Sequence, residues 1–370
     1  MRTTVVVSGM VAGTPGQGGA SWAVLQYVLG FRRLGHDVYL VEPVEDLDPQ
    51  TVAYFRDVAA SFGLERRAAL LRQATRETVG LPYEDVLQAA QDADVLVNVS
   101  GMLTDEQLLE PIPVRVYLDL DPAFVQLWYA VNGIDMRFAA HTHFVTVGQS
   151  IGRPDCPVPT CDRDWLPTLQ PVVLEHWPYA GELVHDAATT VANWRGYGSI
   201  EHEGVFYGQK AHSLRQLIDL PGRTQEHLLL ALAIHEGETP DLDALATHDW
   251  PLVDPAEVTA TPAAYRRFVQ GSKAELGIAK SGYVVSRCGW FSDRSACYLA
   301  SGRPVVAQDT GFGRHLPTGE GLLAFSTTAE AAGALDDVGR DYDRHRRAAR
   351  ALAEEHFDSD RVLARLLERL

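Results

Sequence analysis

Several features that define special classes of protein are scarce in this chain of 370 residues. Only four cysteines occur, at 156, 161, 288 and 297. They are too few for a secreted disulfide scaffold and favour a reducing cytoplasm. No window approaches ~20 uninterrupted apolar residues, the length that a membrane-spanning helix needs. The N-terminal run MRTTVVVSGM lacks the core and cleavage site of a signal peptide. We therefore expect a cytoplasmic protein without a membrane span.

Positive charge is also scarce, with 32 Lys and Arg against 49 Asp and Glu and a formal net charge of −17. Nucleic acids and anionic membranes both attract proteins through a positive field, so we predict that neither is the main partner. One local basic pocket for a small phosphate is still compatible with this balance. Cys156 and Cys161 have no second Cys/His pair at ligand spacing, so no metal site is predicted.

The order of apolar runs predicts two domains. The length exceeds one ordinary domain, and 46% apolar with 22% charged residues is enough for two cores. A β-branched run at residues 3–7, a glycine-rich turn at 12–20, helical spacing at 21–34 and a second apolar run at 37–41 form a βαβ pattern. Further strands are expected at residues 95–99, 114–118 and 144–147.

A change in composition separates the two halves of the chain: six prolines fall between residues 154 and 178, which is typical of a linker. The alternation of strand-like and helical segments then resumes. Helices are expected at residues 208–218, 265–276 and 328–370, the last with a break near 358–359, and strands at 189–192, 228–234, 283–286, 305–307 and 322–325. We predict an α/β protein of two Rossmann-like doubly wound domains facing a central cleft. Its parts are an N-terminal domain at 1–170, a linker at 171–186, a C-terminal domain at 187–350, and a final helix at 351–370 that packs back on the first domain.

Residues 287–325 carry the most informative motif. Ser292 can cap a helix that begins at Asp293, and Gly302 can end it. A helix start beside arginine side chains suits a diphosphate, and a nearby carboxylate suits ribose hydroxyls. A glycine turn follows the next strand. The predicted donor-binding residues here are Arg287, Ser292, Asp293, Arg294, Thr310 and Gly311. The alternative is a capped core helix with a surface arginine.

The glycine loop GTPGQGGAS at 13–21 is less specific. It lacks the Gly-x-Gly-x-x-Gly spacing of dinucleotide sites, and only Glu42 ends the second strand with an acid. The helix that follows can bind an anion through its free amides. A tight turn that needs glycine for steric reasons alone is an equally good interpretation.

Two segments resemble the glycosyltransferases of the GT-B fold: YLASGRPVVAQDTGF in the second half and GGASWAVLQYVLGFRRLGHDVYLVE near the N-terminus. The resemblance implies a nucleoside diphosphate sugar as donor, a basic pair near Arg195 and Lys210 that holds its diphosphate, and contact of the base with residues 250–255. Many retaining members carry Glu-x7-Glu before the Gly-x-Pro-Val run. This chain has Gly289 and Cys297 at those positions, so the roles of these glutamates must fall elsewhere, such as on Asp293.

An inverting transfer needs a base on the first domain that faces the cleft. Asp119 and Asp121 close a predicted strand at the edge where doubly wound sheets bind ligands. His141 and His143 precede the next strand. We rank Asp121 first, then His143, Asp119 and His141. The competing interpretations are a turn cap for Asp121 and packed or surface side chains for the histidines.

The leading hypothesis is a glycosyltransferase that moves a sugar from a nucleoside diphosphate to a small-molecule or glycan acceptor. No metal or other cofactor is expected, because Arg, Lys and helix amides can neutralise the leaving diphosphate. The Asp-x-Asp pattern at 119–121 lies in the first domain, away from the expected diphosphate. A sugar-nucleotide epimerase and a catalytically silent nucleotide-sugar binder are the alternatives, and a nicotinamide dehydrogenase ranks last.

Overall fold

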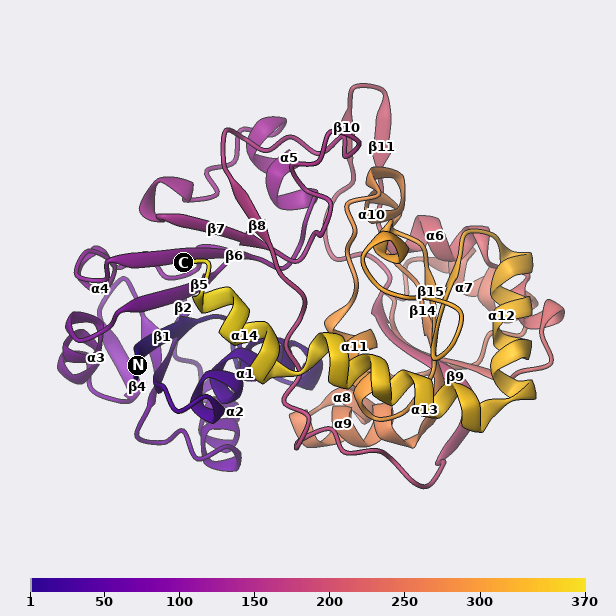
Figure 1. The fold of residues 1–370 in the computed structure, drawn as a ribbon, viewed down its shortest axis with the longest axis horizontal. Coiled ribbons are helices and arrows are strands. Elements are labelled where there is room, and N and C mark those ends of the chain that lie inside the picture. Colours follow the sequence, from indigo (N-terminus) through magenta and orange to yellow (C-terminus); the bar gives the residue numbers. More distant parts are fainter. Residues whose placement is uncertain (1) are drawn as a thin grey trace.

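The computed structural model describes residues 2–370 and organises them around two β-sheets (Figure 1). The first sheet has eight strands in the order β4-β3-β2-β1-β5-β6-β7-β8, all parallel to their neighbours except the β3/β4 pair. These strands are β1 (Thr4–Ser8), β2 (Asp37–Val44), β3 (Ala68–Arg72), β4 (Glu77–Gly80), β5 (Val95–Val99), β6 (Val114–Asp119), β7 (His143–Thr146) and β8 (Trp165–Pro167). Its helices are α1 (Gly18–Arg33), α2 (Pro49–Ser61), α3 (Tyr83–Gln91), α4 (Glu106–Leu109) and α5 (Phe124–Ala130).

The second sheet has six parallel strands in the order β13-β12-β9-β14-β15-β16. Its strands are β9 (His185–Asn193), β12 (Leu228–Ala233), β13 (Leu252–Val253), β14 (Ser272–Gly277), β15 (Val305–Gln308) and β16 (Leu322–Phe325). Strands β10 (Ile200–His202) and β11 (Val205–Tyr207) form a separate hairpin. The helices are α6 (Lys210–Gln216), α7 (Thr239–Thr247), α8 (Pro255–Thr259), α9 (Pro262–Gly271), α10 (Ser281–Ser286), α11 (Asp293–Ala300), α12 (Thr328–Arg340), α13 (Tyr342–Leu352) and α14 (Ser359–Leu367).

The strand order confirms the predicted fold class. In the second sheet the chain runs outward from β9 to β13, then returns to β14 on the other side of β9. This reversal defines a topological switch point between β9 and β14, the place where doubly wound sheets bind ligands. The first sheet reverses in the same way between β1 and β5.

Two predicted elements are wrong. The expected helix at 265–276 ends at Gly271, and the chain continues directly as the central strand β14. The expected strand at 283–286 belongs to the short helix α10. Its run Tyr-Val-Val-Ser has high β-propensity, but that propensity depends on an available sheet neighbour, and here the segment packs against Phe124 of the first domain instead.

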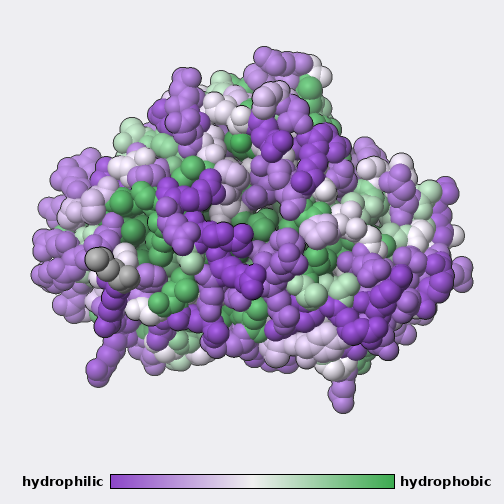
Figure 2. All heavy atoms as spheres, in the orientation of Figure 1, coloured by the Kyte–Doolittle hydropathy of each residue, from purple (hydrophilic) through white to green (hydrophobic). Residues whose placement is uncertain are grey.

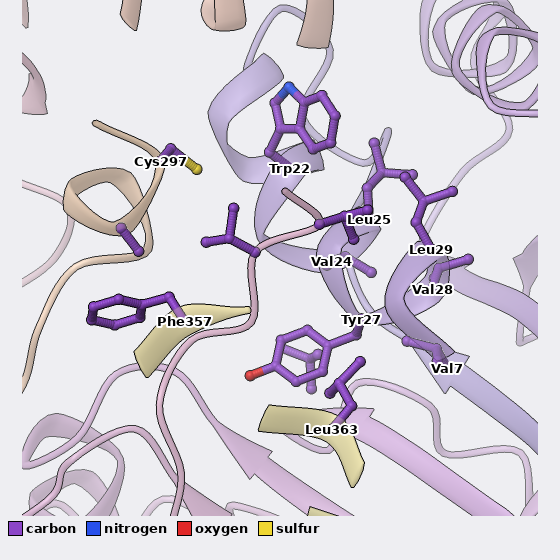
Figure 3. Packing of buried hydrophobic residues seen from close by; sticks show 14 of the residues in the cluster. Val7, Trp22, Val24, Leu25, Tyr27, Val28, Leu29, Cys297, Phe357 and Leu363 are labelled. Carbon is purple, nitrogen blue, oxygen red and sulfur yellow. The ribbon is translucent and has the colours of Figure 1, made fainter. Parts of the chain in front are cut away.

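Helix α1 is buried against both halves of the molecule. Eleven of its 16 residues are buried, far more than one apolar stripe would require. Figure 3 shows Trp22 and Tyr27 of α1 in one cluster with Cys297 of α11 and Phe357 of the C-terminal segment. The hydrophobic core is therefore continuous from the first domain into the second around this helix.

The C-terminal segment crosses back to the first domain, where α14 lies against α1 (Figure 1). Backbone hydrogen bonds between Val172 and both Phe357 and Ser359, at 2.7 and 2.9 Å, hold the crossing point. Leu363 is fully buried and sits over Gly30, where an added Cβ would come within 2.5 Å of its side chain. The boundaries at residues 170, 186 and 350 stay predictions.

No helix within residues 2–370 is long and apolar enough to cross a membrane. The face in Figure 2 is mainly hydrophilic, with apolar residues in separate small patches.

Replacing Leu363 with alanine tests the docking of α14. The change leaves a cavity between α14 and α1, so we expect the free energy of unfolding to fall by about 3 kcal/mol in a denaturant titration. The exposed neighbour Arg361→Ala is the matched control and should change it by less than about 0.5 kcal/mol. Equal effects of the two substitutions would contradict the docking.

Candidate functional site

A pocket of about 670 Å³ opens between the two domains. One wall is the glycine loop and the first turn of α1, and the other is formed by the carboxyl ends of β9 and β12 and the segment from β13 through α8. Its lining residues are Pro15, Gly16, Gln17, Gly19, Ala20, Val191, Ala192, Asn193, Leu232, Ala233, Ile234, Leu252, Val253, Asp254, Pro255, Ala256 and Thr259. The pocket thus unites the glycine loop with most of the 250–255 segment, and its volume suits a ligand of nucleotide size.

Glu42 holds the glycine loop in shape. Its carboxylate is fully buried and accepts the backbone amides of Val11, Ala12 and Gly13, with oxygen to nitrogen distances of 2.9, 2.9 and 2.6 Å. Burial raises the pKa of this carboxyl to about 7, although the three amide donors oppose the shift. Glu42 is therefore a scaffold for the loop and does not face a ribose.

Glycine at position 18 lets the two domains touch. A Cβ there would lie 2.2 Å from the carbonyl oxygen of Thr261, which belongs to the loop before α9. The indole nitrogen of Trp22 donates to the next carbonyl, that of Pro262, at 2.8 Å. The glycine requirement is thus a close approach of backbones across the domain boundary.

Lys210 does not line this pocket, but it lies close to β9, the strand whose carboxyl end does. Lys210 is the first residue of α6. The amide of the second residue, Ala211, donates to the carbonyl of Trp194, just past β9. Within residues 2–370, its ammonium group makes no ion pair and no hydrogen bond. Burial, reinforced by the positive charges of Arg294 and Lys280, lowers the pKa of Lys210 well below its usual value. An anionic ligand here would supply the missing counter-charge.

Arg294 is already neutralised. Its Nε donates to the buried carboxylate of Glu275 at 2.5 Å, and its Nη1 donates to the carbonyl of Val191 at 2.8 Å. The carboxylate of Glu275 is fully buried. This pair fixes α11 to the central strands β14 and β9, so its first role is structural and a direct diphosphate contact by Arg294 is not supported.

The other residues predicted around α11 lie outside the pocket. Ser292 caps the helix as expected, with its hydroxyl accepting the amide of Arg294 at 3.2 Å, and Gly302 ends it with a φ of +65°. Arg287 is half-exposed and pairs with Asp309 at 3.3 Å. Thr310 donates its hydroxyl to the carbonyl of Trp290.

The turn that follows β15 closes on itself and on the α10–α11 loop. The amide of Gly311 donates to Asp309 at 2.8 Å, and that of Gly289 donates to the carbonyl of Thr310 at 2.9 Å. Asp293 is partly exposed and acts electrostatically on Lys210. Of this predicted group, Asp293 and Arg294 are therefore the residues whose charges act on Lys210, with opposite signs.

Arg195 is already paired with an acid. Its guanidinium donates to Glu238 at 2.5 Å and is about a third exposed. Of the two basic residues that the resemblance implied, Lys210 is the one left without an anion in the described structure.

Asp121 lies at the cleft, at the end of β6, but its carboxylate is occupied. Lys280 donates to both of its oxygens, at 3.0 and 2.8 Å. The hydroxyl of Tyr197 donates at 2.5 Å, and the hydroxyl of Tyr283 donates to the other oxygen. All three donors come from the second domain, so this cluster joins the two halves of the molecule.

The remaining candidate bases lie away from the cleft. Asp119 is fully buried and accepts from Gln126 at 2.9 Å and Thr146 at 2.8 Å, and burial raises its pKa to about 6. His143 pairs in register with Val116, three residues before Asp119, so it lies ~10 Å toward the amino edge of the sheet. His141 is buried against Asn98, and burial lowers its pKa to about 4. A catalytic role for these three residues is not supported.

Cys297 and Gly289 occupy the two positions at which many retaining GT-B glycosyltransferases have glutamates. Both residues pack against the first domain here. Cys297 is buried in the core shared with α1, with its sulfur 3.7 Å from the side-chain nitrogen of Gln26. Gly289 has a φ of +77° and lies against Ser150 of the first domain. A glutamate at either position would face the domain interface.

Sequence reasoning missed Lys280, Tyr197 and Tyr283. Lys280 stands three residues beyond the end of β14, at the topological switch point. The helix expected through residue 276 hid the end of β14, which lies at Gly277. A correct strand assignment would have marked Lys280 as a cleft residue.

No family model and no curated protein matches this sequence. Solved structures do match it over nearly their whole length. An α-glucosyltransferase in complex with UDP-glucose and DNA containing an abasic site aligns with a TM-score of 0.64 and 13% identity, covering 100% of this chain and 98% of that chain. HepE from Anabaena with UDP-glucose gives 0.62 and 12%, covering 99% and 100%. A glycosyltransferase from Rickettsia africae gives 0.58 and 10%, covering 99% and 97%.

The protein therefore has the fold of the GT-B glycosyltransferases, as the two sequence segments predicted. One prediction needs correction. Several matching α-glucosyltransferase structures contain DNA, so the exclusion of nucleic acid as a partner is wrong. The net charge of −17 averages over the whole surface, whereas DNA contact depends on the local field of one patch.

Substitution of Glu42 by glutamine tests the buried carboxyl by its pH dependence. A carboxyl whose pKa rises from 4.5 to about 7 on folding stabilises the fold below pH 4.5, and that contribution is lost as the pH rises through 7. The amide oxygen of glutamine can keep the loop amides as donors. The free energy of unfolding of the wild type, relative to Glu42→Gln, should therefore fall by about 3 kcal/mol between pH 4.5 and 8. Parallel pH profiles in denaturant titrations would contradict this.

Proposed function

We propose that the protein is a glycosyltransferase that transfers a sugar from a UDP-sugar donor to an acceptor hydroxyl. The observation that carries the proposal is the interdomain pocket of about 670 Å³, with Lys210, a lysine without an ion-pair partner, on the helix next to β9, in a fold whose matching structures hold UDP and UDP-glucose. The uracil base of the donor would lie against the segment of residues 252–256 that lines the pocket. The diphosphate would then lie toward Lys210.

The proposed diphosphate position combines charge with restricted access to water. Arg294, whose positive charge acts on Lys210, donates to the carbonyl of Val191, and Val191 lines the pocket. Lys210 begins α6, and the amide of the next residue, Ala211, donates to Trp194, one residue beyond the pocket residue Asn193. A positive charge in a partly dehydrated position interacts with an anion more strongly than one in bulk water. We assign the neutralisation of the leaving diphosphate to Lys210 and not to a metal ion.

The proposed reaction is a displacement at the anomeric carbon. The acceptor oxygen forms a bond to that carbon while the bond from the carbon to the diphosphate oxygen breaks, and the electron pair leaves with the diphosphate. The proton of the acceptor hydroxyl passes to a carboxylate of the first domain. We assign this role to Asp121, because it is the candidate at the carboxyl edge of the sheet that faces the second domain.

The direct test combines binding and turnover. UDP, ADP, GDP and dTDP are compared by thermal shift, and then labelled UDP-glucose is incubated with the protein alone and with acceptors. Because a matching structure holds a 13-mer DNA that contains an HMU base, an oligonucleotide of that kind belongs among the acceptors. Slow release of glucose or its transfer supports the proposal. Epimerised donor would indicate an epimerase, and binding without turnover would indicate a silent binder. If none of the diphosphates shifts the melting temperature, the proposed donor is wrong. Activity should persist in EDTA.

Lys210→Met is predicted to separate binding from stability. The variant loses the cation at the diphosphate, so its dissociation constant for UDP should rise about 10- to 100-fold, the scale of a partly buried charge contact. It also loses a partly buried charge without an ion-pair partner, so its melting temperature without ligand should stay equal or rise. The measurements are isothermal titration calorimetry and thermal denaturation. A variant that is destabilised and binds UDP like the wild type would refute both the position and the charge argument.

A further inference from the structure

Lys280 is held between the two domains by an acid and three aromatic rings. Its ammonium lies 4.3 Å from the ring centre of Tyr197 and 5.1 Å from those of Phe124 and Tyr283. Asp121 supplies the negative charge at 2.8 Å. The lysine side chain is 21% exposed and the aspartate side chain 24% exposed, so the pair is in contact with solvent. Cation–π contacts keep the ammonium stable while it is only partly hydrated.

Lys280 is also the neighbour of Lys210. The amide of Ser281 donates to the carbonyl of Gln209 at 3.4 Å, and that of Gly282 donates to Gly208 at 2.9 Å. Lys210 directly follows Gln209, and Lys280 directly precedes Ser281, so these bonds bring the two lysines close together. The charge of Lys280 also acts on the ammonium of Lys210. The segments after β9 and β14 therefore carry two lysines side by side at the switch point, one without an anion and one paired across the cleft.

We propose that Lys280 exchanges its anion during the reaction, from Asp121 in the free protein to the diphosphate of the bound donor. This inference rests on the proposed function and deepens it. A donor diphosphate carries at least two negative charges against one on Asp121, and it would lie beside Lys210, next to Lys280. The flexible four-carbon stem of lysine allows such a change of partner without movement of the backbone.

The exchange has a consequence for catalysis. In the free protein four donated hydrogen bonds, two of them from Lys280, occupy the carboxylate of Asp121. A carboxylate in that state cannot accept the proton of an acceptor hydroxyl. When Lys280 turns to the diphosphate, only Tyr197 and Tyr283 remain as donors, and both oxygens regain acceptor capacity. The donor must then bind before Asp121 can accept the proton of the acceptor hydroxyl. The exchange therefore makes activation of the acceptor depend on bound donor.

Nucleotide affinity tests the exchange because the two partners are predicted to act in opposite directions. Asp121→Asn removes the anion that competes for Lys280, so UDP and inorganic pyrophosphate should bind about fivefold more tightly than to the wild type. Lys280→Met removes the shared cation, so both should bind about fivefold more weakly. In the double variant, Asp121→Asn should no longer tighten binding, because no lysine remains to be released. Isothermal titration calorimetry on the full chain measures all four proteins.

Asp155→Asn is the matched control. Asp155 forms an ion pair with Arg314 across the same domain interface, but it has no lysine to release. Its substitution should leave UDP affinity unchanged, whereas an effect of domain loosening would appear in both aspartate variants. If the wild type binds UDP but Asp121→Asn binds it equally or more weakly, Lys280 stays with Asp121 and the inference is overturned. If Asp121→Asn proves unstable, Lys280→Met alone decides: unchanged affinity overturns the exchange. Failure of the wild type to bind any diphosphate overturns the proposed donor as well, which distinguishes the two failures.

Discussion

The burial of α1 from both sides is the constraint on which the rest of the structure depends. A helix that follows the first strand of a doubly wound domain normally covers one face of its own sheet. Here it also contacts α9 through Gly18 and Trp22, and α14 through Gly30. These contacts bring the glycine loop to the mouth of the second sheet. The pocket between the domains is therefore built by the packing of one helix, and its walls come from segments more than 170 residues apart.

The charges at the switch point divide into compensated and uncompensated groups. Arg294 has Glu275, and Lys280 has Asp121, whereas Lys210 has no anion in the described structure. Even partial burial of a cation without a partner costs stability unless a ligand supplies the counter-charge, so such groups tend to mark functional sites. The net charge of −17 sums over all of these groups and does not reveal the one lysine without an ion pair.

Much of the fold follows from local patterns. The periodicity of the apolar residues predicted the opening βαβ unit, most strands of both sheets and the cap of α11 by Ser292. The predicted helix at 265–276 failed because Ser272–Gly277 is short and mixed in composition, and only its place between β9 and β15 makes it a strand. The run at 283–286 failed for the opposite reason: it has the composition of a strand but no sheet neighbour.

The site was less predictable than the fold. Lys210 follows from its resemblance to a family motif, yet nothing in the sequence distinguishes it from Arg195, whose anion, Glu238, is supplied by a distant loop. Asp119 and Asp121 look alike in sequence, but one turns into the core and the other toward the second domain.

The sequence by itself determined most of the elements and their order, because hydrophobic periodicity, caps and glycine turns act over a few residues. Only the tertiary structure decided which charges are neutralised and which carboxylate faces the cleft. Ion pairing and burial depend on residues brought together from both domains, and no local pattern records those encounters.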